Sequence, residues 1–253
     1  MLALKLLLVP AFLLLLSLAG RRWGPEVAGR LAGLPALTGP ILFLLALEKG
    51  TAFAAAAAVV SLSAVFGAVV YIVAYSRVCA RNPPALAFLV GFASWCCAAL
   101  LLTSLALTPL ASLIIALVAL AIAPKLIPRV SAPLTLAPLP LPRRELPLRM
   151  LAGAALTLAV TSLAALIGPA WSGMLAVFPV LAIVLSVFSH RASGPAFAAT
   201  LLRGMILGLY AFTSFCLVLA LLLPSQGVAL SFASAIMVAL AVQWTLMSRL
   251  RRR

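Results

Sequence analysis

Acidic side chains and histidine are almost absent from this chain. Its 253 residues include three acids, Glu26, Glu48 and Glu145, and one histidine, His190. These residues form no carboxylate pair at catalytic spacing, and together with the four cysteines they form no metal-binding or redox motif. A glycine-rich phosphate-binding loop is missing too. We therefore expect no catalytic activity, no metal and no cofactor.

Charged residues of either sign are also scarce. They make up 8% of the chain, against 66% hydrophobic residues, and the mean hydropathy is +1.30. A water-soluble domain of this length cannot bury so much apolar surface. A net charge of +15 would suggest nucleic acid in a soluble protein, but here the basic residues lie between apolar runs, where they set membrane topology. We expect an all-α membrane protein in a lipid bilayer that binds no nucleic acid.

Long apolar runs divide the chain into segments that can each cross the hydrocarbon core, which takes about twenty residues. The stretch 84–127 is too long for one span, and Thr108-Pro109 offers a break because proline favours a helix start. This division predicts about nine transmembrane helices, over 3–19, 31–47, 52–75, 84–106, 109–127, 150–167, 170–189, 195–223 and 228–247.

The basic residues are distributed unevenly between the two sides of such a bundle. With nine spans, fifteen of the 18 Lys and Arg residues fall on one side, Lys5 and Lys49 fall on the other, and Arg203 falls within a helix. Positive loops face the cytoplasm, so we expect a bacterial inner-membrane protein with its N-terminus outside and its C-terminus cytoplasmic. The first run resembles a secretory signal, but Arg21-Arg22 directly after it favour a retained helix.

The chain aligns with itself, without gaps, at a spacing of 144 residues. Glycine and proline carry this match, because coincidences of Leu and Ala are frequent in such a composition. The shared landmarks are Gly24-Pro25 and Gly168-Pro169, Gly29 and Gly173, Pro35 and Pro179, and Gly50 and Gly194. This pattern is typical of a tandem duplication.

The predicted spans place the two copies in opposite orientations. The first membrane repeat, 1–108, begins outside, whereas the second, 149–253, begins inside, because an extra transmembrane helix at 109–127 switches the parity. A Pro-rich basic cytoplasmic linker, 128–148, is a stiff tether or a docking site for a cytoplasmic partner. We therefore predict two inverted-topology repeats of four helices each, an arrangement found in transporters.

Both copies also share a short motif. Copy one has Ala28-Gly29, Leu34-Pro35 and Glu48-Lys49-Gly50 at spacings that copy two repeats as Ser172-Gly173, Phe178-Pro179 and Ala192-Ser193-Gly194. With this motif the chain resembles two fused copies of the GlpM family of small bacterial inner-membrane proteins. The resemblance implies a membrane location and carries no chemistry with it.

Prolines at corresponding places in the two copies mark the candidate substrate site. Pro35 and Pro179 each remove a backbone hydrogen bond from a predicted helix, and around Pro35 we expect Thr38, Gly39 and Pro40 to leave regular helix as well. In lipid the freed carbonyls need partners or a wet cavity, and interrupted helices in two inverted halves indicate a transport site. The alternative is a packing kink.

The few charged groups in or beside the helices are further candidates. Glu48 and Lys49 follow the second span as a gate or ion-coupling pair, or as solvated interfacial residues. His190 is a coupling candidate that titrates near neutral pH, or an exposed loop residue. Arg203 lies inside the eighth span, where it binds an anionic substrate or extends to the cytoplasmic headgroups.

These observations favour a secondary transporter or lipid-linked substrate carrier that works by alternating access between inverted repeats. Its substrate would be a small or lipid-linked molecule, anionic if Arg203 contributes. The alternative is a non-transporting membrane scaffold or assembly subunit. The motif Gly204-xxx-Gly208 permits close helix approach, either within the bundle or at the face of a homodimer.

Overall fold

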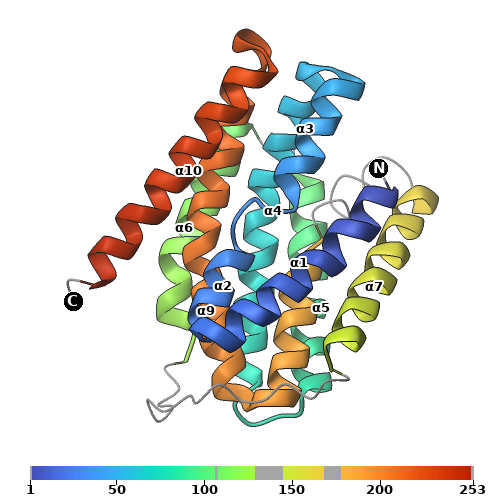
Figure 1. Ribbon diagram of the computed structural model, residues 1–253, viewed down its shortest axis with the longest axis vertical. Coiled ribbons are helices and arrows are strands. Elements are labelled where there is room, and N and C mark those ends of the chain that lie inside the picture. The colour runs from blue at the N-terminus through green and yellow to red at the C-terminus, as the bar shows by residue number, and fades with distance from the viewer. Residues whose placement is uncertain (1, 106–107, 129–144, 168–177, 252–253) are drawn as a thin grey trace.

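A computed structural model describes residues 2–105, 108–128, 145–167 and 178–251 of the chain. Within these residues the protein forms nine α-helices and no strand (Figure 1). The helices are α1 (Leu2–Trp23), α2 (Pro25–Ala32), α3 (Thr38–Lys49), α4 (Thr51–Val78), α5 (Pro84–Ser104), α6 (Pro109–Leu126), α7 (Glu145–Ile167), α9 (Val180–Gln226) and α10 (Val228–Arg251).

Seven of these helices are long and apolar enough to cross a membrane, namely α1, α4, α5, α6, α7, α9 and α10. The architecture is therefore that of an all-helical, multi-pass membrane protein. The number differs from the nine predicted spans for two reasons. The run 31–47 is divided between α2 and α3, of which α3 has 12 residues and a length of about 18 Å. The runs 170–189 and 195–223 contribute to one element, the 47-residue α9.

Helix α9 folds back on itself. Gly194 inside it has φ 84° and ψ 173°, a left-handed conformation that favours glycine because it has no Cβ. Figure 1 shows two antiparallel legs joined by a turn at the lower end of the bundle. We name residues 180–193 the first leg and residues 195–226 the second leg. Gly50 has a closely similar conformation, φ 91° and ψ 163°, at the turn from α3 into α4.

Both predicted proline sites are non-helical, and we call them the first and second breaks; the second is described only at Phe178 and Pro179, directly before the first leg of α9. The first break separates Ala32, the end of α2, from Thr38, the start of α3, and contains Pro35. Thr38 therefore begins a helix, and the expectation that the three residues from Thr38 to Pro40 leave regular helix is wrong, because a proline in a first helical turn displaces no intrahelical hydrogen bond. The second break ends at Pro179, where Val180 N donates to the Phe178 carbonyl at 2.7 Å in a tight turn before the first leg.

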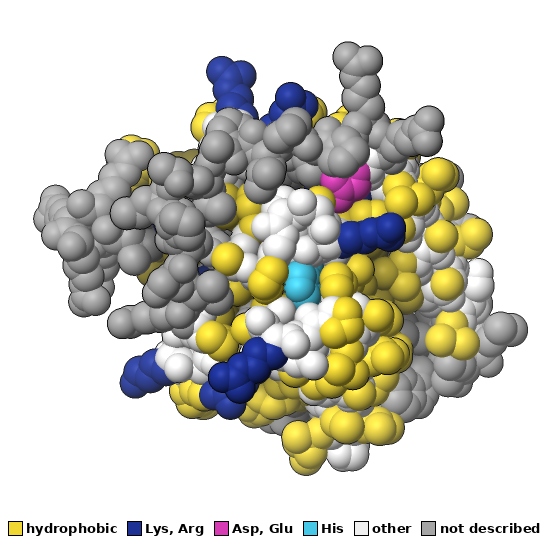
Figure 2. Space-filling model, turned by 90° about the horizontal axis from the view of Figure 1, so that it is seen from below, with side chains coloured by type: hydrophobic (Ala, Val, Ile, Leu, Met, Phe, Trp, Pro, Cys, Tyr) yellow, Lys and Arg dark blue, Asp and Glu magenta, His cyan; other side chains and the backbone are white. Residues whose placement is uncertain are grey.

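Basic residues gather at one end of the bundle, as the sequence predicts. Arg21 and Arg22 end α1, Arg77 ends α4, Lys125 ends α6, and Arg191 lies beside the turn of α9. Figure 2 views this end, which we call the basic end, and shows Lys and Arg side chains around it with the chain's one histidine near the centre. The opposite end carries the turn at Gly50.

Helix α2 crosses the second leg of α9 at very short range. Gly29 on α2 and Gly33 directly after it lie against the backbone of α9 from Leu201 to Leu209, and a Cβ added to Gly33 would lie 2.8 Å from Gly208 Cα. Such an approach excludes any side chain on either helix. The Gly204-xxx-Gly208 motif is therefore used for packing within the chain.

Three predictions concern the segment between the two copies. Helix α6 agrees with the predicted extra helix, and Thr108 caps it by accepting a hydrogen bond from Ala111 N at 3.2 Å. Helix α7 begins at Glu145, four residues before the predicted boundary, so Glu145 is helical and not part of a loop. Most of the predicted linker, together with Gly168-Pro169 and Gly173, lies outside the described residues.

Candidate functional site

A cavity of about 110 Å³ lies where the two helix breaks meet. The first break contributes Leu34 and Leu37 to its wall, and the second contributes Phe178 and Pro179. Helix α4 and the second leg of α9 close its sides, with small and apolar side chains. The main residues of these sides are Ala64, Val65, Ala68, Met205, Leu209 and Phe212.

The chemistry of this cavity is mostly apolar. Thr38 is the one polar side chain among its lining residues. Helix α3 and the first leg of α9 both begin at the cavity, at Thr38 and Val180, so the positive ends of two helix dipoles lie beside it. The cavity therefore fits the apolar part of a molecule and favours a negative partial charge near the helix starts.

The predicted substrate-site residues divide between the cavity wall and the layer behind it. Thr38 and Pro179, which are far apart in sequence, meet at the cavity. Pro35 and Gly39 lie behind the wall, where the Pro35 carbonyl accepts a hydrogen bond from Gly39 N at 2.7 Å. Pro40 is likewise outside the lining residues.

Glu48 and Lys49 lie far from this cavity. Both side chains are exposed at the end of α3, about 15 Å along the helix axis from Thr38. Among the described residues neither makes an ion pair. Their placement agrees with the interpretation as solvated interfacial residues.

His190 is buried, so its interpretation as an exposed loop residue is wrong. It belongs to the first leg of α9, its exposed fraction is 7%, and its Nδ1 lies 3.1 Å from the Tyr75 hydroxyl of α4. One helical turn away, the Tyr71 hydroxyl lies 2.9 Å from Ser186 Oγ. We name these four residues the tyrosine ladder. Sequence reasoning missed both tyrosines, because a single sequence contains no signal for contacts between residues 115 positions apart.

Arg203 contacts the end of α6 and is not among the residues that line the cavity. Its guanidinium donates to the Ile127 carbonyl at 2.7 Å, and beside it Arg77 Nε donates to the Leu126 carbonyl at 3.0 Å. Two cations thus satisfy carbonyls at the negative end of the α6 dipole. The contact directs Arg203 toward the basic end, as the interpretation that it extends to the headgroups expects.

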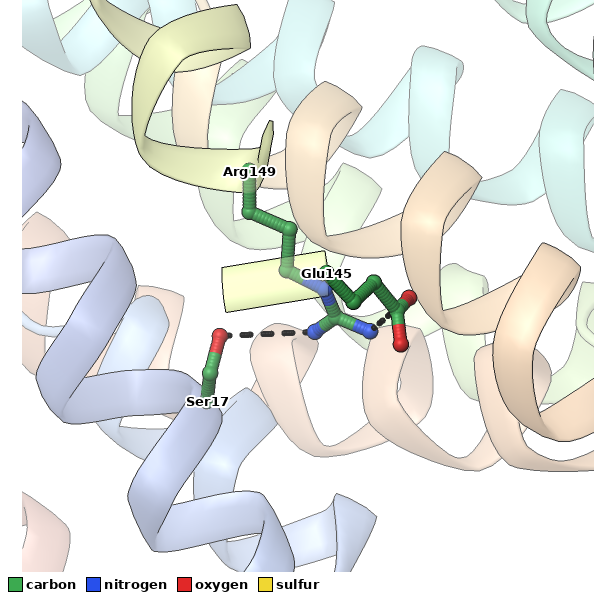
Figure 3. Close-up of polar contacts among 3 residues, drawn as sticks. All are labelled: Ser17, Glu145 and Arg149. Atoms are coloured by element: carbon green, nitrogen blue, oxygen red, sulfur yellow. Dashed lines mark hydrogen bonds and ion pairs between the residues drawn. The ribbon is translucent and has the colours of Figure 1, made fainter. Parts of the chain in front are cut away.

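A buried ion pair holds the start of α7 against α1. Arg149 donates to Glu145 at 2.9 Å and to Ser17 Oγ of α1 at 3.3 Å (Figure 3). The side chains of Arg149 and Glu145 are only 4% and 12% exposed. The sequence predicts a basic cytoplasmic segment for both residues. It does not reveal their burial, because this depends on α1 and on Phe188, whose ring lies 5.9 Å from the guanidinium. The pair orients two helices, and it lies outside the cavity.

Comparison of the chain with protein-family models, with curated proteins and with solved structures gives no match. The resemblance to the GlpM family therefore stays a prediction from the sequence motif. The architecture itself, with its apolar helices and the cavity between two helix breaks, is the basis for a functional proposal.

Proposed function

We propose that the protein is a membrane carrier that works by alternating access between two inverted repeats. One observation carries this proposal: the cavity lies at the non-helical segments before α3 and before the first leg of α9, and it is lined by positions that are separated by the repeat spacing. In carriers built from inverted repeats, discontinuous helices form the substrate site near the middle of the membrane.

Positions separated by the repeat spacing of 144 residues line the cavity together. Each member of a pair occupies the same place in its own copy, at the break, at the start of the helix after it, or on the next helical segment, which is α4 in copy one and the second leg of α9 in copy two. The pairs are Leu34 and Phe178, Leu37 and Leu181, Thr38 and Ala182, Val65 and Leu209, and Ala68 and Phe212. An approximate twofold axis through the cavity would produce this pairing, which supports the inverted repeat.

The first helices of the two copies support the same axis. Helices α1 and α7 pack against each other, and a Cβ added to Gly153 of α7 would lie 3.2 Å from Val9 Cγ1 of α1. Val9 and Gly153 are themselves separated by 144 residues. Contact between corresponding positions is expected only close to a symmetry axis. Gly50 and Gly194 add similar backbone conformations at corresponding turns.

The composition of the cavity favours an apolar or amphiphilic substrate. The wall offers hydrocarbon, one hydroxyl and two helix starts, which suit a lipid-linked or small apolar molecule with an anionic group. In this proposal the basic end faces the cytoplasm of a bacterial inner membrane, because positive loops remain on that side. The N-terminus is then outside and the C-terminus cytoplasmic.

Single-cysteine accessibility tests the proposal without knowledge of the substrate. The four native cysteines are replaced, and Thr38→Cys and Ala182→Cys are made separately, since these residues occupy corresponding cavity positions. Impermeant thiol reagents are then applied to right-side-out and inverted membrane vesicles. A carrier exposes both positions in turn to either side, so we expect labelling from both sides.

Two further variants serve as controls. Ala80→Cys is exposed at the basic end and should label from that side alone. Ala116→Cys matches Ala182→Cys, because both alanines are buried in long helices, but Ala116 lies outside the cavity and should not label. If the two cavity positions behave like Ala116→Cys from both sides, the carrier proposal is wrong and a scaffold explains the fold better.

A further inference from the structure

The tyrosine ladder joins α4 to the first leg of α9 between the cavity and the basic end. Tyr71 contacts Ser186 and Tyr75 contacts His190, so the partners advance by four residues on each helix and the two helices run parallel. Ala182 lines the cavity one turn before Ser186, and His190 follows two turns after Ala182, about 12 Å along the helix. The ladder therefore lies between the cavity and the basic end.

Hydrogen-bond directions in the ladder follow from the chemistry of its groups. Ser186 Oγ donates to the Ile183 carbonyl at 3.1 Å, so it accepts the hydrogen of the Tyr71 hydroxyl. Nδ1 of a neutral His190 accepts from the Tyr75 hydroxyl when the imidazole hydrogen is on Nε2, and donates to it in the other tautomer. In the imidazolium both ring nitrogens carry hydrogen, so Nδ1 can only donate to the Tyr75 oxygen. Protonation also places a positive charge on a ring that is only 7% exposed, which is costly.

No carboxyl group of the chain is available for the same task. Glu26 and Glu145 each form an ion pair with an arginine four residues later in the chain. Glu48 is exposed at the opposite end from His190. An ionisable residue inside a membrane bundle is costly and usually functional. His190 is the one histidine of the chain, and histidine is the side chain whose ordinary pKa lies closest to neutral pH.

The groups around His190 are mostly neutral. Tyr75 and Cys79 face it from α4, and the Cys79 thiol lies near the Ser76 and Pro195 carbonyls. From α7, Arg149 approaches through Phe188, and its charge is paired with Glu145. Arg191 follows on the same helix. The other helices packed on α9 also carry ionisable groups, namely Arg21 and Arg22 on α1, Glu26 and Arg30 on α2, Cys96 and Cys97 on α5, and Lys125 on α6. Among the described residues none of these groups makes a hydrogen bond or an ion pair with His190.

The corresponding positions toward the opposite end contain no polar side chain. The four residues that lie 144 positions from the ladder residues in the sequence, in the other copy, are all buried and apolar. In place of Tyr71, Tyr75, Ser186 and His190 stand Phe215, Leu219, Leu42 and Ala46. Under the proposed repeat, one closure of the cavity is hydrogen-bonded and titratable, and its counterpart is purely apolar. A change of pH therefore acts on one side only.

We propose that His190 is the binding site of a coupling proton, and that its protonation releases the tyrosine ladder and opens the cavity to the basic end. This inference rests on the proposed carrier function and names its coupling ion. Neutral His190 stays packed against Tyr75 inside the bundle. The buried imidazolium is poorly solvated there and gains by moving into water at the basic end, near which it already lies, and this movement ends its contact with Tyr75.

The test follows labelling of Ala182→Cys from the basic end in inverted vesicles at two pH values. The values, about pH 8 and about pH 5, are the two limits of the range in which histidine ordinarily changes its charge. Each rate is divided by that of Ala80→Cys, which corrects for the effect of pH on thiol reactivity. We expect the corrected rate to rise roughly two- to tenfold at the lower pH, the factor for one lost hydrogen bond.

Three variants separate proton binding from a purely structural role. His190→Gln should remove the pH dependence. Tyr75→Phe, which keeps the ring and loses the hydroxyl, should label quickly at both pH values. Tyr210→Phe is the matched control, because the Tyr210 hydroxyl makes no hydrogen bond among the described residues, and it should behave like the native ladder.

The outcomes also separate this inference from the carrier proposal. Labelling of Ala182→Cys from both sides with no dependence on pH, or with a dependence that survives His190→Gln, would overturn the proton site and leave the carrier proposal intact. Absence of labelling from either side at both pH values would overturn both. If His190→Gln does not fold, Tyr75→Phe still tests the inference. The inference requires rapid labelling of Tyr75→Phe at high pH, whatever the result for His190→Gln.

Discussion

The crossing of α2 and the second leg of α9 makes a quantitative prediction about Gly208→Ala. A Cβ at position 208 would meet backbone atoms on α2: the Arg30 carbonyl oxygen, Gly33 Cα at 2.8 Å and Gly33 C at 3.0 Å. Ordinary contacts of a Cβ begin near 3.4 Å. Because backbone cannot rotate out of the way as a side chain does, the two helices must move apart by more than half an ångström.

The cost of this movement follows from the packing around it. Overpacking of a close-packed core costs about 1–3 kcal/mol, and obstruction by backbone places this variant in the upper half of that range. Alanine returns up to about 1 kcal/mol through its higher helix propensity. We expect a net loss of about 1–2 kcal/mol, which lowers the melting temperature of a protein of this size by about 2–8 °C.

Thermal unfolding of the detergent-purified protein, followed by size-exclusion chromatography, measures the effect. Gly39→Ala is the matched control, because its added Cβ would meet only the Phe215 ring, at 3.5 Å, an ordinary contact. Equal melting temperatures for the two variants would refute the predicted obstruction. If Gly204-xxx-Gly208 instead formed a homodimer face, Gly208→Ala would change the oligomeric mass and not the stability of the monomer.

Three other contacts give predictions of their own. Arg149→Met leaves Glu145 buried without its partner and should cost about 3–5 kcal/mol, whereas the double variant with Glu145→Gln should recover most of that stability in the same thermal assay. Arg203→Met removes a charge-assisted hydrogen bond to the end of α6 and should lower the free energy of unfolding by about 1.5–3 kcal/mol. An unaltered melting temperature for this variant would contradict the contact. Burial raises the pKa of the Cys79 thiol to about 11, so its thiolate forms only as the pH approaches that value. Mass spectrometry should therefore find slow modification of Cys79 at pH 7–9 beside rapid modification of the neighbouring, exposed position in Ala80→Cys, and equal rates would show that Cys79 is accessible.

Features controlled by local chemistry could be predicted from the sequence. Proline marked both helix breaks, because the loss of an N–H group acts wherever the residue falls. Thr108-Pro109 marked the start of α6, where the hydroxyl caps the helix and proline occupies its first position. The gathering of basic residues at one end followed from charge and the apolar runs alone.

Features that depend on distant partners could not be predicted. The hydropathy of residues 31–47 is continuous and conceals the separation of α2 from α3, which accompanies the close contact of Gly29 and Gly33 with the α9 backbone. The burial of His190 depends on Tyr75, and that of Arg149 depends on Ser17. In each case the residue is polar, so a sequence without knowledge of its partner favours an exposed position.

The small residues of the cavity wall give the carrier proposal and the scaffold alternative opposite consequences. Larger side chains at Ala64, Ala68 and Ala182 would fill the cavity, since all three line its wall. In a static scaffold such side chains should add apolar contacts and raise the melting temperature without loss of function. In the proposed carrier they should occupy the space of the substrate and obstruct the movement of one helix past another. These alanines are therefore the positions at which added bulk distinguishes the two roles.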